Sequence, residues 1–253
     1  MKIYLAATNS GMTQEDRKTF INKGKPKYQL CTFIEGEKNC YRNLMEAGRD
    51  NFLLDSGAFS FMSGKECSKE TLIEYCDRYI EFINQYDVKQ FFEIDVDTIF
   101  GIEFVEQLRK RIEDRTKKSC IPVWHKGRGI DYWKRMVDNY DYIAIGGLVF
   151  HVKQSEWSLI KKLVDYAYFK NVKVHGLGFT KTNILEMFRW YSVDSTSWKM
   201  SALRGQNIQT FSNGQMLQKN LNTNGKKTNL SKLTLHNGLE WCKYQKYMDS
   251  KRW

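Results

Sequence analysis

Aspartates stand where three short β-rich runs of the sequence end. Asp55 closes one run, Asp95 and Asp97 close a second, and Asp194 closes a third. Asp95 and Asp97, two residues apart on a strand, point to the same side. Carboxylates act in enzymes as nucleophiles and as general acids or bases, although a single aspartate at a strand end is as often only a helix N-cap. Three strands that bring carboxylates to one rim favour a functional site over capping alone.

Histidines and glycines stand at other strand ends. His125 follows one run and fits either substrate binding or a structural hydrogen bond. His175 lies early on its run and is more readily structural. Gly146-Gly147 ends a further run, where the missing side chains let a ligand approach backbone N–H groups or simply relieve crowding.

The elements that must hold these residues follow from alternating β-rich and helical patterns. Strands are predicted over residues 2–8, 51–55, 90–97, 120–125, 142–147, 172–179, 192–195 and 207–212. Amphipathic helices are predicted over residues 101–116, 130–139, 154–169, 181–190 and 232–248. A further helix begins after the N-cap Ser68, with an apolar face of Leu72, Cys76, Tyr79, Ile80 and Ile83. Asn213-Gly214, directly after the last strand, is a strong hairpin signal.

Strands that alternate with helices in this way predict βαβ units and a parallel sheet. About eight strands favour a closed barrel over an open doubly wound sheet, since the first strand runs into Thr8-Asn9-Ser10-Gly11 and not into a glycine-rich phosphate loop. We therefore expect an α/β fold, a TIM-like (β/α)8 barrel forming a single domain over residues 1–253. Residues 9–50 would be an insertion after the first strand with one helix near residues 40–47, and functional residues would lie at the carboxyl ends of the strands.

The charge of the chain is uneven. Its 253 residues carry 40 Lys and Arg against 29 Asp and Glu, a net charge of +11. Residues 198–253 hold ten basic and two acidic residues, which is +8 of that total. A one-sided positive field favours a polyanion partner, most often nucleic acid, over a basic surface that binds nothing.

Composition excludes several other classes of protein. Hydrophobic residues at 42% and charged residues at 27% exclude a disordered or fibrous chain. No apolar run reaches the roughly 18 residues that a membrane span needs, and the apolar N-terminal stretch is too short for a signal peptide, so we expect a cytoplasmic protein. Six scattered cysteines form no CxxC pair, which predicts free thiols and no metal; a zinc site from distant Cys and His stays open without support from the spacing.

Five short segments lie at the ends of successive predicted strands. They are Asp55-Ser56-Gly57-Ala58-Phe59, Ile94-Asp95-Val96-Asp97-Thr98, Ala144-Ile145-Gly146-Gly147-Leu148, His175-Gly176-Leu177-Gly178 and Val193-Asp194-Ser195. In this order they resemble the tRNA-guanine transglycosylase superfamily, which includes the queuine and archaeosine tRNA-ribosyltransferases. The resemblance covers about residues 52–205 and is closest to the phage and genomic-island DNA transglycosylases known as DpdA.

The resemblance implies a base exchange through a covalent glycosyl-enzyme, without a cofactor. Asp194 would be the nucleophile that attacks C1′ of a guanosine, and Asp55 the general acid/base for the leaving and incoming bases. Displacement at an anomeric carbon passes through an oxocarbenium-like state that a carboxylate can stabilise or trap. The carboxyl group that holds the proton should have a higher pKa than the nucleophile.

The same resemblance places base-binding residues at this rim. The substrate-binding candidates are Asp95, Asp97, His125, Gly146, Gly147, Leu148 and Phe59. Asp95 fits the reader of the purine edge best, with Asp97 second, and Gly147 and Leu148 would offer backbone groups to the base. His125 stands where the family has Gln-Gly. Aromatic side chains would either stack on a flipped guanine or pack at the rim; they are Phe59, Trp124, Phe150 and Trp198.

Departures from the family favour DNA over tRNA as the partner. The chain lacks the CxCxxC zinc pattern that the tRNA enzymes carry after strand seven, and it has no room for additional RNA-binding domains. Candidates for phosphate contacts are Lys126, Lys199, Arg204, Lys226 and Lys227. The expected co-substrate is a 7-deazaguanine base, and no membrane contact is expected.

Three other functions stay open. The first is the same exchange on tRNA or on a free nucleoside. The second is a non-catalytic barrel that binds nucleic acid beside an active subunit, against which intact Asp55 and Asp194 argue. The third is an enzyme for a small phosphorylated substrate cradled by Gly146-Gly147, which the carboxylates at the rim would repel.

Overall fold

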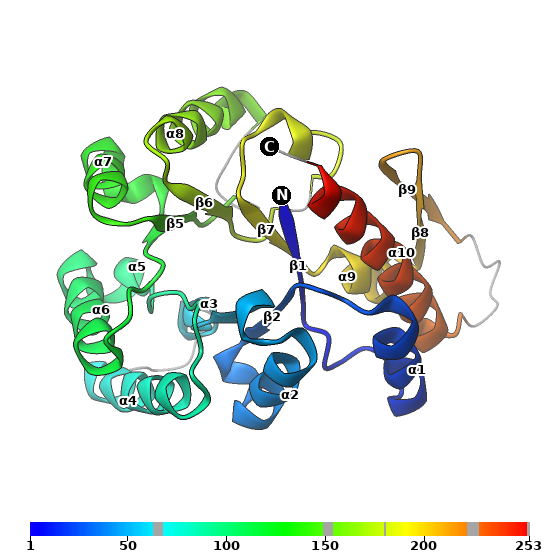
Figure 1. Ribbon diagram of the computed structural model, residues 1–253, viewed down its shortest axis with the longest axis horizontal. Coiled ribbons are helices and arrows are strands. Elements are labelled where there is room, and N and C mark those ends of the chain that lie inside the picture. Colours follow the sequence, from blue (N-terminus) through cyan, green and yellow to red (C-terminus); the bar gives the residue numbers. More distant parts are fainter. Residues whose placement is uncertain (63–67, 149–153, 180, 222–227, 252–253) are drawn as a thin grey trace.

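The computed structural model describes residues 1–62, 68–148, 154–179, 181–221 and 228–251 of the chain. Within these residues, seven parallel strands form a curled sheet in the order β3-β2-β1-β7-β6-β5-β4, with helices around the outside (Figure 1). The strands of this sheet are β1 Lys2–Ala6, β2 Gln29–Thr32, β3 Phe52–Asp55, β4 Val123–Trp124, β5 Tyr142–Ile145, β6 Lys173–Gly176 and β7 Ser192–Ser195; a separate pair is β8 Asn207–Ser212 and β9 Gln215–Asn220. The predicted α/β class and parallel sheet are confirmed.

Single bridges connect the two edge strands of the parallel sheet. Leu54 of β3 forms a parallel bridge with Phe91, and Phe92 forms one with Ile121, just before β4. The third predicted strand is thus reduced to these bridging residues. The Val123 N–H of β4 donates to the side-chain carboxylate of Glu93 at 2.9 Å, in place of a backbone carbonyl. The regular pairing of backbone groups therefore stops at this point.

Helices follow most of the strands and cover the outer side of the sheet (Figure 1). They are α1 Gln14–Thr19, α2 Glu37–Ala47, α3 Ala58–Met62, α4 Lys69–Tyr86, α5 Asp97–Phe100, α6 Ile102–Thr116, α7 Gly129–Asn139, α8 Trp157–Phe169, α9 Ser197–Gly205 and α10 Leu230–Ser250. α4 begins as predicted, because the Ser68 hydroxyl accepts the Thr71 N–H at 3.2 Å, and its predicted apolar face is buried. The closing helix is confirmed with slightly wider bounds.

Residues 9–50 are not an inserted loop, contrary to the prediction. They hold α1, β2 and α2, and β2 lies between β1 and β3 in the sheet. β2 has only four residues, and it is polar at both ends, with Gln29 fully buried and Thr32 partly buried. Such a short segment lacks the alternating or apolar pattern by which a strand is predicted.

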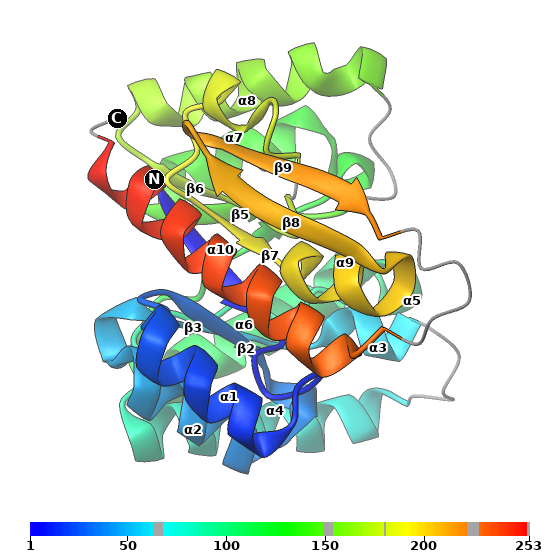
Figure 2. The same cartoon turned by 90° about the vertical axis from the view of Figure 1, so that its right-hand side faces the viewer.

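The last predicted strand, β8, lies outside the parallel sheet. It pairs antiparallel with β9 around Asn213-Gly214, where φ angles of +49° and +79° confirm the predicted hairpin turn. Side chains of α10 hydrogen-bond the other edge of β8; Asn237 Oδ1, for example, accepts the Gln209 N–H at 2.8 Å. The hairpin therefore lies against α10, as Figure 2 shows.

The helix predicted over residues 181–190 is absent apart from one 3-10 turn, Leu185–Met187. Phe188 and Trp190 are both buried, and the rings of Trp190 and Phe179 lie 5.4 Å apart. Two buried aromatic residues at a spacing of two fit an extended segment and not a helix, which explains the difference.

The cysteines and the helix lengths bear on two further expectations. The described cysteines, which are Cys31, Cys40, Cys76, Cys120 and Cys242, are all free and buried. Cys67 lies outside the described residues. In the part of the chain that the structure describes, no helix has the length and apolar character that a membrane crossing requires.

Candidate active site

An apolar cluster covers much of the side of the sheet that faces away from the helices, and β6 and β7 bring polar side chains into it. Its apolar cluster comprises Tyr4, Ala6, Tyr28, Leu30, Leu53, Phe92, Ile121, Val123 and Ala144. On β7, Val193 packs into the helix-side core, so that Ser192 and Asp194 face the inner side. On β6, Val174 and His175 alternate in the same way. The two neighbouring strands thus supply three polar side chains, His175, Ser192 and Asp194, to the inner side of the sheet.

Asp194 is held through one of its two carboxylate oxygens. The Gly178 N–H donates to Oδ1 at 2.6 Å, and His175 Nε2 lies 3.2 Å from the same atom. Gly178 has φ of +64°, a left-handed conformation that suits glycine and aims its N–H at the carboxylate. Oδ2 has no hydrogen-bond partner among the described residues, and 11% of the side chain stays exposed. Asp194 therefore offers one free oxygen at the carboxyl end of β7.

Asp55 at the end of β3 has the properties of a group that holds a proton. Thr32 Oγ1 donates to its Oδ2 at 3.1 Å, and the Gly57 N–H donates to Oδ1 at 3.1 Å. The pKa of Asp55 is raised to about 7, first because the carboxyl is withdrawn from water and then because of the negative charges of Asp95 and Asp194. Asp95 and Asp194 are thus close enough to Asp55 to act on its charge.

Asp95 and His125 form a pair at the rim. His125 Nε2 lies 2.8 Å from Asp95 Oδ2, and Asp95 Oδ1 has no partner within the described chain. A Cβ at Gly146 would lie 2.5 Å from His125 Cε1, so the glycine is required by the close approach of the imidazole. The structure therefore joins three of the predicted site residues in one contact.

Asp97 does not share the surroundings of Asp95, contrary to the expectation that both point to one side of a strand. Residue 97 opens α5 instead of continuing a strand, and its carboxylate accepts from Arg128 Nη2 at 2.7 Å. Burial alone would raise the pKa of Asp97, but the Arg128 guanidinium lowers it below its usual value. Asp97 is therefore committed to an ion pair.

A buried ion network that the sequence reading missed supports this part of the rim. Glu93 is fully buried and accepts from Arg109 at 2.8 Å and from Arg128 at 2.7 Å. The Arg128 guanidinium thus forms ion pairs with both Glu93 and Asp97. A charged residue inside the apolar run Phe91-Phe92-Glu93-Ile94 is the sequence signal that could have revealed it, because a buried carboxylate requires a cationic partner.

The segment after β5 presents backbone donors. Gly147 has φ of +71°, and the N–H groups of Gly147 and Leu148 have no hydrogen-bond acceptor among the described residues. The Leu148 side chain itself is buried in the helix-side core. The backbone N–H groups of Gly147 and Leu148 are therefore available to bind a ligand, as the prediction requires, whereas the Leu148 side chain is not.

The aromatic candidates separate into two groups. Trp124 and Trp198 are buried: Trp198 stacks on Phe20 with ring centroids 5.5 Å apart, and Trp124 Nε1 donates to the Gly129 carbonyl at 2.8 Å. Both tryptophans are core residues and do not present a ring to a base, so the packing alternative is correct for them. The Phe59 side chain and Phe150 lie outside the described residues.

The basic candidates also differ from one another. Lys199 is turned inward, where Nζ donates to Ser10 Oγ at 2.7 Å and burial lowers the pKa of the amine. Lys126 is exposed and forms an ion pair with Glu156. Arg204 is exposed at the end of α9 and has no ion pair among the described residues. Lys226 and Lys227 lie outside the described residues.

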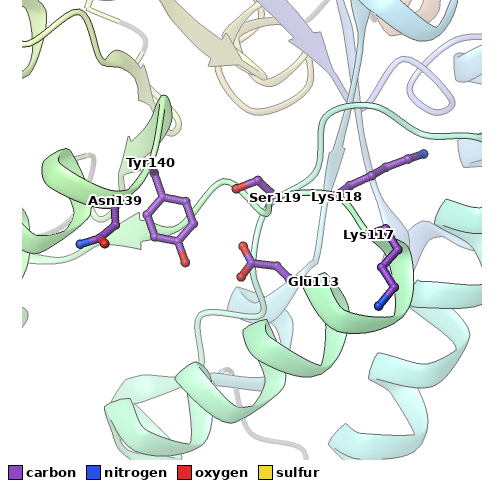
Figure 3. A pocket seen from close by; sticks show the side chains of 6 residues that line it. All are labelled: Glu113, Lys117, Lys118, Ser119, Asn139 and Tyr140. Atoms are coloured by element: carbon purple, nitrogen blue, oxygen red, sulfur yellow. The ribbon is translucent and has the colours of Figure 1, made fainter.

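A surface pocket of about 420 Å³ lies elsewhere (Figure 3). It is lined by Glu113, Lys117, Lys118, Ser119, Asn139 and Tyr140. These residues belong to the ends of α6 and α7, where the chain enters β4 and β5, so the pocket adjoins the amino ends of the strands. It is separate from the rim that carries the aspartates.

The described residues hold no group of three or more His, Cys, Asp or Glu side chains arranged for a metal ion. No protein-family model matches the chain, and neither does any curated protein. The chemistry that the site can perform follows from its own geometry: one carboxylate with a free oxygen, one carboxyl with a pKa near neutrality, and a third that is fixed by an imidazole.

Gly146→Ala tests the contact with His125. The added Cβ forces the imidazole away from Asp95, and we expect the unfolding free energy to fall by about 1–3 kcal/mol, the usual cost of overpacking. Gly127→Ala is the matched control, because a Cβ there has open space around it. Urea unfolding of both variants measures the effect; equal stabilities would show that the contact is not tight.

Proposed function

We propose that this protein is a guanine transglycosylase that exchanges guanine in a nucleic acid, DNA in preference to tRNA, for a 7-deazaguanine derivative. The observation that carries the proposal is the contrast between two aspartates at one rim. Oδ2 of Asp194 has no partner among the described residues, and its other oxygen is held by two hydrogen bonds, whereas Asp55 has a pKa of about 7. A nucleophile and an acid/base distinguished by their surroundings are what a double displacement requires.

The steps follow from these two groups. Asp194 Oδ2 attacks C1′ of the guanosine, the bond from C1′ to N9 breaks, and the leaving guanine takes a proton from Asp55. The product is a glycosyl ester on Asp194. Asp55, now ionised, removes the N9 proton of the incoming base, which attacks C1′ and releases the Asp194 carboxylate. Each group returns to its initial state.

Recognition of the base is assigned to the Asp95–His125 pair. Guanine presents N–H donors on its Watson–Crick edge, and Asp95 Oδ1, which has no partner among the described residues, is an acceptor for them. A 7-deazaguanine shares that edge, so that one pair can receive both the leaving and the incoming base. The N–H groups of Gly147 and Leu148, which have no acceptor in the described part of the chain, are suited to the guanine carbonyl oxygen.

We propose that the strands belong to a complete barrel. The bridges of Phe91 and Phe92 link β3 to the chain just before β4. We propose that this segment serves as the eighth strand and closes a (β/α)8 barrel. In such barrels the functional residues lie at the carboxyl ends of the strands, where Asp55 and Asp194 stand. The cytosol is the compartment in which such an enzyme meets its substrates.

Exchange of labelled guanine into nucleic acid tests the proposed function. Purified protein and radiolabelled guanine are incubated in separate reactions with duplex DNA, single-stranded DNA, tRNA or guanosine. Incorporation into DNA supports the proposal, and incorporation into tRNA alone or guanosine alone would shift the substrate to that class. Nucleic-acid binding without incorporation into any of them would overturn the enzymatic proposal in favour of a binding subunit.

Part of the basic C-terminal charge is free to contact phosphates. Lys232, Lys243 and Lys251 form ion pairs with acidic residues of the chain. Arg204 and Lys219 are exposed and have no ion pair in the described part of the chain. These two residues lie on α9 and β9; Lys199, which is nearer to Asp194 in sequence, is turned inward.

Arg204→Ala combined with Lys219→Ala should weaken DNA binding for all sequences alike. Each lost phosphate contact lowers the dependence of log affinity on log salt by about one unit, so the slope should fall by about two. Lys110→Ala with Lys162→Ala removes the same charge from the outer helices α6 and α8 and should leave the slope unchanged. Binding titrations at several salt concentrations measure the two slopes. Equal slopes for both double variants would show that α9 and β9 do not contact the DNA.

A further inference from the structure

A row of polar side chains runs along the inner side of the sheet from Asp194 toward the amino ends of the strands. His175 Nε2 lies 3.2 Å from Asp194 Oδ1, and His175 Nδ1 lies 2.6 Å from Ser192 Oγ. Ser192 Oγ in turn lies 2.6 Å from the Tyr142 hydroxyl. His175 and Ser192 are fully buried, while Tyr142 is partly exposed. The row therefore connects the reacting carboxylate with the opposite end of the sheet.

Strand register builds this row. His175 of β6 stands directly beside Ser192 of β7, and Asp194 follows two residues later on the same face of β7. The rings of Tyr4 and Phe92 flank the imidazole, with centroids 6.0 and 5.1 Å away. An imidazole among apolar rings must have its ring nitrogens satisfied by fixed partners, because an unpaired polar atom there is costly.

With Asp194 as the acceptor and a neutral His175, one set of hydrogen-bond directions satisfies the whole row. An ionised Asp194 can only accept, so His175 Nε2 carries the proton and donates. A neutral His175 then accepts at Nδ1 from the Ser192 hydroxyl. Ser192 Oγ remains an acceptor for the Tyr142 hydroxyl, and each group in the row is satisfied.

We propose that His175 is the positioning residue for Asp194, fixed in its Nε2–H form by Ser192 and Tyr142. This inference rests on the proposed function of Asp194 as the nucleophile. With the Gly178 N–H, the imidazole fixes Oδ1 from two sides, which leaves Oδ2 as the oxygen that faces the substrate. The arrangement differs from a Ser-His-Asp hydrolase, because Ser192 is fully buried and does not reach a substrate.

The tautomer of His175 is measured without reference to activity. The protein is labelled with ¹⁵N in its histidine rings, and the His175 signals are identified by their loss in His175→Gln. Near neutral pH we expect a protonated Nε2 and an unprotonated Nδ1 in the wild type. Ser192→Ala should convert this pattern into a mixture of tautomers. A protonated Nδ1 in the wild type, or a pattern unaffected by Ser192→Ala, would overturn the proposal.

Activity separates positioning from packing. In single-turnover measurements His175→Leu should lower the rate of glycosyl-enzyme formation by about 10- to 100-fold with little change in substrate affinity. His175→Gln, which retains an N–H donor, should recover most of that rate. His236→Leu is the matched control, because the hydrogen bond of His236 in the described part of the chain goes to the Gln209 carbonyl on β8 and not to Asp194. A wild-type rate in folded His175→Leu would refute the positioning role.

Failure of the proposed function is distinguishable from failure of this inference. If the wild type shows no base exchange on any nucleic acid, the transglycosylase proposal falls, while the tautomer spectra still decide whether His175 orients Asp194. If exchange occurs but the spectra show no dependence on Ser192, the positioning role alone is lost.

Discussion

Asp194→Asn is expected to abolish base exchange while the protein still folds and binds nucleic acid. The asparagine carbonyl can keep the position of Oδ1, so that His175 and Gly178 still donate to it. The amide nitrogen that replaces Oδ2 has no anionic lone pair for attack on C1′. Loss of a nucleophile removes the covalent route itself, and we expect the exchange rate to fall by at least about 10⁴-fold.

Labelled-guanine exchange and DNA titration together measure this result. Asp138→Asn, an exposed aspartate on α7 that stands apart from the rim, controls for the loss of one negative charge. After incubation with DNA, a denaturing gel should show a covalent protein–DNA adduct for the wild type and none for Asp194→Asn. Exchange at the wild-type rate in this variant would assign the nucleophile to another residue.

Asp55→Asn is expected to make the protein more stable at alkaline pH. A carboxyl whose pKa is raised on folding destabilises the fold once it ionises. Because the pKa of Asp55 rises from 3.8 in its ordinary state to about 7, the wild type should lose stability as the pH rises from about 4 to about 7. Between pH 5 and 8 this amounts to about 2–3 kcal/mol, a loss that the asparagine variant lacks.

Urea unfolding at pH 5 and pH 8 for both proteins isolates this effect. Asp77→Asn is a control of opposite sign, because hydrogen bonds from Arg111 lower the pKa of Asp77, and its removal should cost more stability at pH 8 than at acid pH. The Asp55 variant should also lose exchange activity by about 10²- to 10⁴-fold, since it can neither protonate the leaving base nor deprotonate the incoming one. An identical pH dependence in wild type and Asp55→Asn would show that Asp55 is not a proton-holding group.

The parts of the fold that were predictable are those fixed by local chemistry. Ser68 as an N-cap and Asn213-Gly214 as a turn depend on the conformations of a few residues, and both predictions are confirmed. β2 was missed because its buried Gln29 is paired by Thr8, a residue distant in sequence. The segment 181–190 was misread because its aromatic residues are placed by the core and not by a helical period.

The candidate site shows the same division. The rim aspartates were predicted because each ends a β-rich run of the sequence. Asp55 and Asp194 do lie at the carboxyl ends of β3 and β7, whereas Asp95 follows two bridging residues and not a regular strand. The partners of these residues were not predictable, since Arg128, which binds Asp97, and His175, which contacts Asp194, come from other strands or loops. The type and local position of a residue indicate which chemical roles it can have. Its contacts with residues from other strands decide whether it is held in an ion pair, as Asp97 is, or remains available to a substrate.

The position of β1 in the middle of the sheet has a consequence for how the chain folds. Lys2 of β1 pairs with Ser192 of β7, and Gln245 of α10 donates to the Ile3 carbonyl at 2.7 Å. Contacts between segments so distant in sequence form late, because loop closure must precede them. During synthesis β1 is therefore an apolar strand with one edge unpaired until β7 has emerged, and chaperones would have to protect it from association with other chains. We expect pulsed hydrogen exchange during refolding to show the Lys2 amide, which donates to the Tyr191 carbonyl at 3.0 Å, among the last to gain protection.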